Sequence, residues 1–177
     1  AFTGSTEVGK KIASAIAGTK KKLTLELGGK AANILFEDAP LDQAVEGIIN
    51  GIYFNQGHVC CAGSRLLVQE GIYDEVIQLL TNRIQILRVG DPLDKNTDIG
   101  AINSKEQLCR IEELVQAGQD EGADLVQSAC ELPGSGFWFK PSFFTNVTSS
   151  HRVAQEEIFG PVLSVMTFRT PAEAVAR

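Results

Sequence analysis

The sequence predicts an α/β protein in which a largely parallel sheet is flanked by helices. Short apolar runs that are typical of strands alternate along the chain with amphipathic segments of helical periodicity, and this alternation favours parallel strands. The 177 residues, of which 44% are hydrophobic and 21% charged, can bury one sizeable core. The chain opens on AFTGS and stops within TPAEAVAR, so we expect an internal piece of a longer protein.

Apolar periodicity and turn residues predict the elements of the first half. Apolar side chains recur at helical spacing after the turn at 3–5, and most regularly from Leu41 to Ile52, after Asp38 and Pro40. The short runs between these helices have the character of strands. In chain order we expect a strand end at 1–2, a helix to about 17, strands at 23–27 and 32–36, a helix to about 52, a strand at 65–69 and a helix over about 72–87.

The second half begins with a loop at 90–103, because this stretch is rich in glycine, proline, aspartate and asparagine. Ser104 and Gln107 form a capping-box pattern, which predicts a helix to about Gly118. The elements expected after this helix are strands at 125–127 and 163–168, an irregular aromatic segment at 132–141 between them, and a starting helix at 170–177.

Composition and charge argue against several classes of function. The net charge of −6 comes without a basic stripe, so we expect no nucleic-acid partner. No apolar run reaches the roughly 18 residues of a membrane span, so we expect no membrane partner either. The four cysteines show no CxxC spacing, which argues against a zinc site and a disulfide framework and favours a reducing compartment. We therefore expect the cytoplasm, with an organelle left open.

The adjacent cysteines Cys60 and Cys61 lie in YFNQGHVCCAGSR, a loop that follows the regular helix and precedes a strand. A thiol at such a boundary is typical of a nucleophile in covalent catalysis, in which the thiolate form attacks the substrate. The alternative is a free cysteine that only packs. His58, two residues before Cys60, also leaves open the thiol–histidine pairing of a hydrolase.

Two acids and one hydroxyl accompany this thiol. Glu26 precedes a Gly-Gly turn and faces either a cleft or solvent, and it is the available base for hydrolysis of an acyl intermediate. Glu157 precedes Phe159-Gly-Pro, which sets an apolar ring beside the charge. Ser5 lies in a Gly-Ser-Thr turn at a helix N-terminus, which suits a phosphate or, more simply, an ordinary helix cap.

Four motifs in this order resemble those of the aldehyde dehydrogenase superfamily. LELGGKAA is similar to the glutamate signature of the family, FNQGHVCCAGSR to its cysteine signature, EEIFGPV to its third motif and FTGSTEVG to its cofactor turn. The cysteine loop also resembles the branch of the family numbered sixteen, whose members carry a second dehydrogenase-like domain. The sequence departs from the family at His58, where glutamine or glutamate is usual.

The resemblance implies a specific role for each residue. Cys60 would attack the aldehyde carbonyl, NAD or NADP would accept the hydride, and water activated by Glu26 would release the acid. The Cys60 backbone N–H would supply half of an oxyanion hole, and Cys61 would take no part in the reaction. The residues implied to contact the cofactor are Gly4, Ser5, Gly28, Glu157 and Phe159.

The resemblance also implies the domain organisation. Residues 1–28 would be the C-terminal end of a Rossmann-like cofactor domain, and residues 29–177 most of a catalytic domain that is incomplete at its C-terminus. We expect a small-molecule aldehyde as substrate, a parent protein that forms a homo-oligomer, and an isolated piece that is inactive. The alternatives are a noncatalytic dehydrogenase-like scaffold and a thiol hydrolase.

Overall fold

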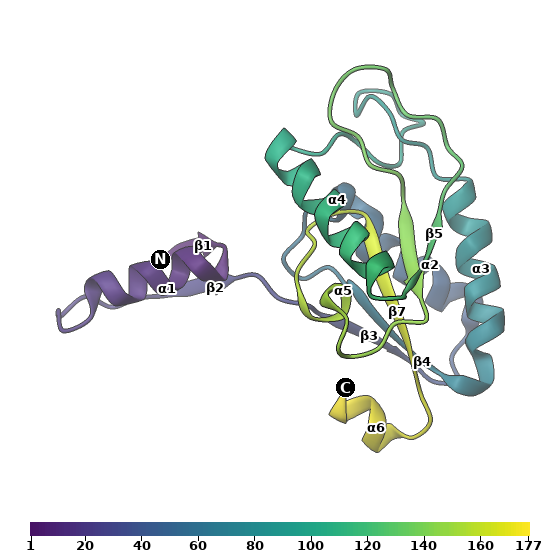
Figure 1. Ribbon diagram of the computed structural model, residues 1–177, viewed down its shortest axis with the longest axis horizontal. Helices are drawn as coiled ribbons and strands as arrows, with labels where there is room; N and C mark the ends of the chain where they lie inside the picture. The colour runs from purple at the N-terminus through teal and green to yellow at the C-terminus, as the bar shows by residue number, and fades with distance from the viewer.

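The protein has the α/β fold that its sequence predicts, and the computed structural model describes residues 1–177 (Figure 1). Its main sheet has five strands in the order β3-β4-β7-β6-β5. The strands span β3 Ala32–Leu35, β4 Arg65–Gln69, β5 Asp124–Gln127, β6 Ser142–Thr145 and β7 Val162–Phe168. Neighbouring strands are parallel except for β5 and β6, which pair antiparallel.

Helices cover both faces of this sheet. They span α2 Leu41–Tyr53, α3 Tyr73–Gln85, α4 Lys105–Asp120, α5 Arg152–Gln155 and α6 Pro171–Ala176, with short 3-10 turns at Phe54–Gly57 and Glu70–Ile72. Successive strand residues point to opposite faces, so Leu66 packs in the core cluster under α2 and α3, whereas Leu67 packs in the cluster under α4 and α5. None of the helices combines the length and the apolar character that crossing a membrane requires.

Residues 1–27 form a separate β-α-β unit. The strands β1 Phe2–Gly4 and β2 Leu25–Leu27 pair in parallel, and α1 Thr6–Ile16 connects them. In Figure 1 this unit projects away from the main sheet and is joined to it by residues 28–31. The predicted boundary at residue 28 and the assignment of the two parts to a cofactor and a catalytic domain both stay predictions.

The structure differs from the expected elements mainly between 132 and 155. The strand β6 was not expected, because SFFT does not alternate: Ser142, Phe143 and Phe144 are all fully buried between two layers. The short helix α5 was not expected either, since its four residues give too little periodicity to detect. The strand β2 is two residues shorter than predicted, whereas β4 matches its predicted range of 65–69.

A buried hydrogen bond ties α2 to the sheet just before the cysteine loop begins. The Tyr53 hydroxyl donates to the Ser142 carbonyl over 2.9 Å, and Tyr53 is 2% exposed. Burial raises the pKa of Tyr53 far above its ordinary value, so the phenol stays protonated and donates at every working pH.

We expect Tyr53→Phe to lower the free energy of unfolding by about 1 to 2 kcal/mol, because a buried carbonyl loses its donor. Urea unfolding of the full-length protein measures this change. As a control, Tyr73→Phe removes a hydroxyl that is only half-buried and should cost less. Equal losses in the two variants would contradict the importance of the Tyr53 bond.

Candidate functional site

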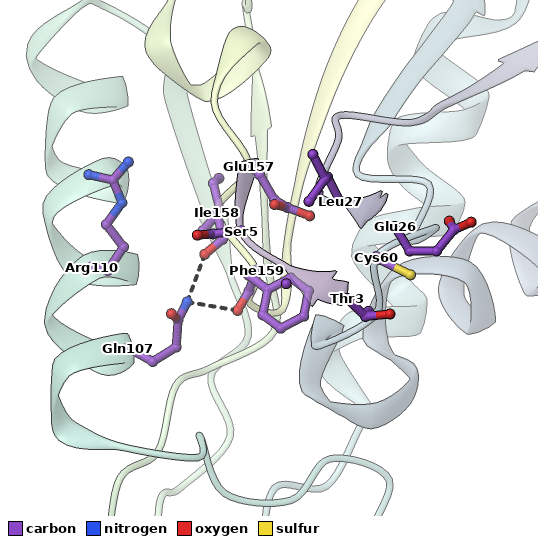
Figure 2. Close-up of a pocket in the computed structure, with 12 residues that line it drawn as sticks. Thr3, Ser5, Glu26, Leu27, Cys60, Gln107, Arg110, Glu157, Ile158 and Phe159 are labelled. Carbon is purple, nitrogen blue, oxygen red and sulfur yellow. Dashed lines mark hydrogen bonds between the residues drawn. The ribbon is translucent and has the colours of Figure 1, made fainter. Parts of the chain in front are cut away.

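A cavity of about 330 Å³ lies where the β1-α1-β2 unit meets the main sheet (Figure 2). All seven residues that the sequence predicts as catalytic or cofactor-binding line it. They are Gly4, Ser5, Glu26, Gly28, Cys60, Glu157 and Phe159. The structure therefore brings together side chains from four motifs that are far apart in the sequence. It adds residues that the sequence did not indicate, among them Gln107 and Arg110 of α4.

The cysteine loop owes its shape to an unusual backbone between α2 and β4. Asn55 and Gln56 adopt left-handed conformations, with φ of 49° and 58°. The Asn55 side chain donates to the His58 carbonyl over 3.1 Å, and the Gln56 side chain accepts from the Gly100 N–H over 3.0 Å. These two bonds hold the turn, and Cys60, whose thiol is free and exposed, follows it at the cavity.

Gly57 sets the distance between the cysteine loop and the Phe159 loop. Its φ is +73°, and a Cβ at this position would overlap the Gly160 carbonyl group. The two loops thus approach backbone to backbone, which only glycine permits here.

Glu26 is the central residue of β2, opposite Thr3 in the register with β1. The side chain is exposed to solvent, and it also lines the same cavity as Cys60. The two alternatives for Glu26, a position facing a cleft and a position facing solvent, therefore do not exclude each other. In Figure 2, Glu26 and Cys60 lie on the side of the cavity away from α4. The acid and the thiol thus face one cavity although they belong to different parts of the chain.

The adjacent acids Glu156 and Glu157 have different environments. Glu156 pairs with Arg152 and Arg110 at 2.6 Å each, and these hydrogen bonds, the one from Arg152 first, hold the pKa of its carboxyl below its ordinary value. Glu157 instead lines the cavity and accepts from the Gly29 N–H over 3.3 Å. One acid therefore fixes α5 to α4, and the other is presented to the cavity.

Gly28 makes the room in which the Glu157 carboxylate lies. A Cβ on Gly28 would overlap that carboxylate, whereas a Cβ on the next residue, Gly29, would meet open space. A side chain at Gly28 would therefore force the Glu157 carboxylate to shift, whereas one at Gly29 would not.

The helix predicted from the capping-box pattern is confirmed, but the Gln107 side chain makes contacts that this pattern does not predict. Ser104 caps α4 by accepting from the Gln107 N–H over 3.1 Å, as expected. The Gln107 side chain, however, does not return to the cap; it donates to the carbonyls of Ile158 and Phe159 over 2.9 and 3.0 Å (dashed in Figure 2). A glutamine that caps its own helix and one that holds a distant loop have the same sequence pattern, so local reasoning missed this role.

Ser5 caps a helix, which is the simpler of the two roles predicted for it. It is the N-cap of α1 and accepts from the Val8 N–H over 3.3 Å. Ser5 and its neighbours Thr3 and Gly4 nevertheless line the cavity, so the cap and a contact to a bound molecule are compatible.

The His58 side chain is directed toward Phe159. The two rings stack with centroids 5.3 Å apart and planes 13° apart. The Nε2 atom is buried and has no hydrogen-bond partner, and burial lowers the pKa of the imidazole. His58 is therefore a neutral ring at pH 7, without the partnered nitrogen that a general base in a thiol hydrolase requires.

The chain is similar to aldehyde dehydrogenases over its whole length. A model of the aldehyde dehydrogenase family matches residues 1–177. Human retinal dehydrogenase 2 is 47% identical over 178 residues, an alignment that covers 100% of this chain and 34% of the human protein.

Solved structures give the same result. An NAD-dependent aldehyde dehydrogenase from Sinorhizobium meliloti superposes with a TM-score of 0.95 at 46% identity. A betaine aldehyde dehydrogenase from Staphylococcus aureus, solved in complex with NAD+, superposes with a TM-score of 0.94 at 39% identity. Both alignments cover 99% of this chain and 35% of the other, so the chain spans about a third of the length of its relatives.

Proposed function

Because the chain belongs to the aldehyde dehydrogenase family, we propose that the full-length protein oxidises an aldehyde to a carboxylic acid with NAD as hydride acceptor. The observation that carries this proposal is that Cys60, Glu26 and Glu157 line one cavity. A nucleophile, a base and an acceptor for sugar hydroxyls are the groups that this reaction needs from the protein. The relatives named above for retinal and betaine aldehyde support an aldehyde as the substrate class.

The lining of the cavity suits the nicotinamide end of a dinucleotide. The Glu157 carboxylate can accept from ribose hydroxyls. Arg110, which pairs with Glu156 and Glu113, has five guanidinium N–H groups and so keeps some beyond these two pairs. The turn at Gly4 and Ser5, before α1, is suited to a phosphate. When bound, the dinucleotide supplies the acceptor for the hydride that leaves the substrate carbon. On this proposal residues 1–28 belong to the cofactor domain and residues 29–177 to the catalytic domain.

Cys60 performs the first step. The thiol proton passes to solvent, the thiolate sulfur forms a bond to the carbonyl carbon of the aldehyde, and the carbonyl oxygen becomes the oxyanion of a thiohemiacetal. The Cys60 backbone N–H makes no hydrogen bond within the protein, so it is free to donate to this oxygen. Loss of the hydride from the same carbon then leaves a thioester on Cys60.

Glu26 performs the second step. Its carboxylate takes a proton from a water molecule, and the water oxygen attacks the thioester carbonyl. The carbon–sulfur bond breaks, the carboxylic acid leaves, and the Cys60 sulfur is regenerated. The exposed position of Glu26 at the cavity supports this role, since the attacking water must come from solvent.

The two rival functions have less support. A thiol hydrolase would use His58 as its base, but that imidazole stacks on Phe159 and its buried Nε2 has no partner. A noncatalytic scaffold would have no need of the thiol and both acids at one cavity. Reduction of NAD by the full-length protein with a panel of aldehydes tests the proposal, and absence of NAD binding would favour the scaffold.

Gly28→Ala is expected to raise the KM for NAD about tenfold. The new methyl group displaces the Glu157 carboxylate, so one charge-assisted hydrogen bond from the ribose to this carboxylate is lost. Steady-state kinetics with varied NAD measure the change. Gly29→Ala is the matched control: its Cβ meets open space and its N–H is retained, so KM should stay within about twofold. Equal effects of the two substitutions would disprove the assignment of Glu157.

A further inference from the structure

The stacked rings of His58 and Phe159 connect the cysteine loop to the loop that carries Glu157. His58 lies two residues before Cys60, and Phe159 lies two residues after Glu157. The ring planes are within 13° of parallel, with centroids 5.3 Å apart. Phe159 also lines the cavity, so the imidazole supports an aromatic wall of the site.

The backbone of Phe159 is held independently of His58. Phe159 has a φ of +54°, a left-handed conformation that costs a bulky residue free energy. Gln107 donates to the carbonyls of Ile158 and Phe159, and Gly160 packs against Ile111. These contacts involve the main chain of this loop, whereas the ring of Phe159 is in stacked contact with the ring of His58.

The imidazole is suited to fix that side chain. A planar ring in parallel contact restricts the orientation of its neighbour. The Nε2 atom is buried and unpartnered, so a protonated imidazole would bury a charge here. His58 therefore acts as a flat, neutral surface and not as an acid or a base.

We propose that His58 is a positioning residue for dinucleotide binding: its ring stacks on Phe159 and fixes the aromatic wall against which the nicotinamide end of NAD packs. This inference rests on the proposed function. Because His58 acts through Phe159, its loss weakens cofactor binding and leaves the attack by Cys60 and the hydrolysis by Glu26 unchanged.

Two substitutions in the full-length protein distinguish the contribution of the planar His58 ring from that of its nitrogen atoms. His58→Ala removes the stack and should raise the KM for NAD about five- to tenfold, with kcat within about twofold of the wild-type value. His58→Phe retains a planar ring and should restore the KM to within about twofold. A KM that is unchanged in His58→Ala, or raised equally in His58→Phe, would overturn the proposal.

Two further measurements keep the test decisive. His151→Ala, at the other histidine of the chain, controls for general effects and should leave both constants unchanged. Crystal structures of the His58 variants should show a reoriented Phe159 ring in His58→Ala and the original orientation in His58→Phe; an unmoved ring in both refutes the positioning role. Wild-type protein that reduces no NAD with any aldehyde would refute the proposed function instead, while the crystal structures would still decide the role of His58.

Discussion

Cys60→Ala is expected to reduce aldehyde-dependent NAD reduction by the full-length protein at least about a thousandfold, because the substitution removes the sulfur that forms the thioester on the proposed mechanism. The dissociation constant for NAD should stay within about threefold, since the substitution leaves Glu157 and the turn at Ser5 untouched. Stopped-flow absorbance of NADH measures the first quantity and isothermal titration calorimetry the second. The pair of results separates loss of chemistry from loss of folding.

Cys61→Ala is the matched control for this prediction. Both cysteines are free and exposed, but only Cys60 lines the cavity. The Cys61 variant should retain its activity to within about threefold. If Cys60→Ala remained active while Cys61→Ala did not, the nucleophile would have to be reassigned to Cys61.

Glu26→Gln is expected to have the second-largest effect, slowing hydrolysis of the thioester by about a hundred- to ten-thousandfold. The amide cannot take a proton from water, although it has nearly the same shape as the carboxylate. Acylation of Cys60 does not need this base on the proposed mechanism. Rapid mixing should therefore show a burst of one NADH for each active site, followed by very slow turnover.

The control for Glu26 is the exposed Glu7, which belongs to the same β-α-β unit but pairs with Lys11 away from the cavity. Glu7→Gln should leave both the burst and the steady rate unchanged. A Glu26→Gln protein with a normal rate of thioester hydrolysis would show that another group activates the water.

Much of the fold could be predicted from the sequence because its signals are local. Helix α2 shows regular apolar spacing over its whole length, and the range of β4 follows from an apolar run between a glycine-rich loop and the Glu70-Gly71 turn. The seven predicted site residues were found as members of motifs. Their meeting at one cavity follows from the sheet order, which local patterns do not contain.

The parts that were missed depend on long-range contacts. Strand β6 is buried on both faces and therefore lacks the alternation that marks a half-exposed strand. Gln107 and Arg110 are three residues apart on α4 and so share one face of the helix, but only the tertiary fold reveals that this face meets the cavity. The stack of His58 on Phe159 likewise joins residues that are far apart in the sequence.

The contact between Gly57 and Gly160 limits how this site can be redesigned. A side chain at Gly57 would push against the main chain at Gly160, and no rotamer of a neighbour could relieve the overlap. Transplanting the cysteine loop into another scaffold would therefore require grafting the Phe159 loop with it. For an engineer the thiol and the aromatic wall are a single module, and combinatorial libraries that vary one loop should keep both glycines fixed.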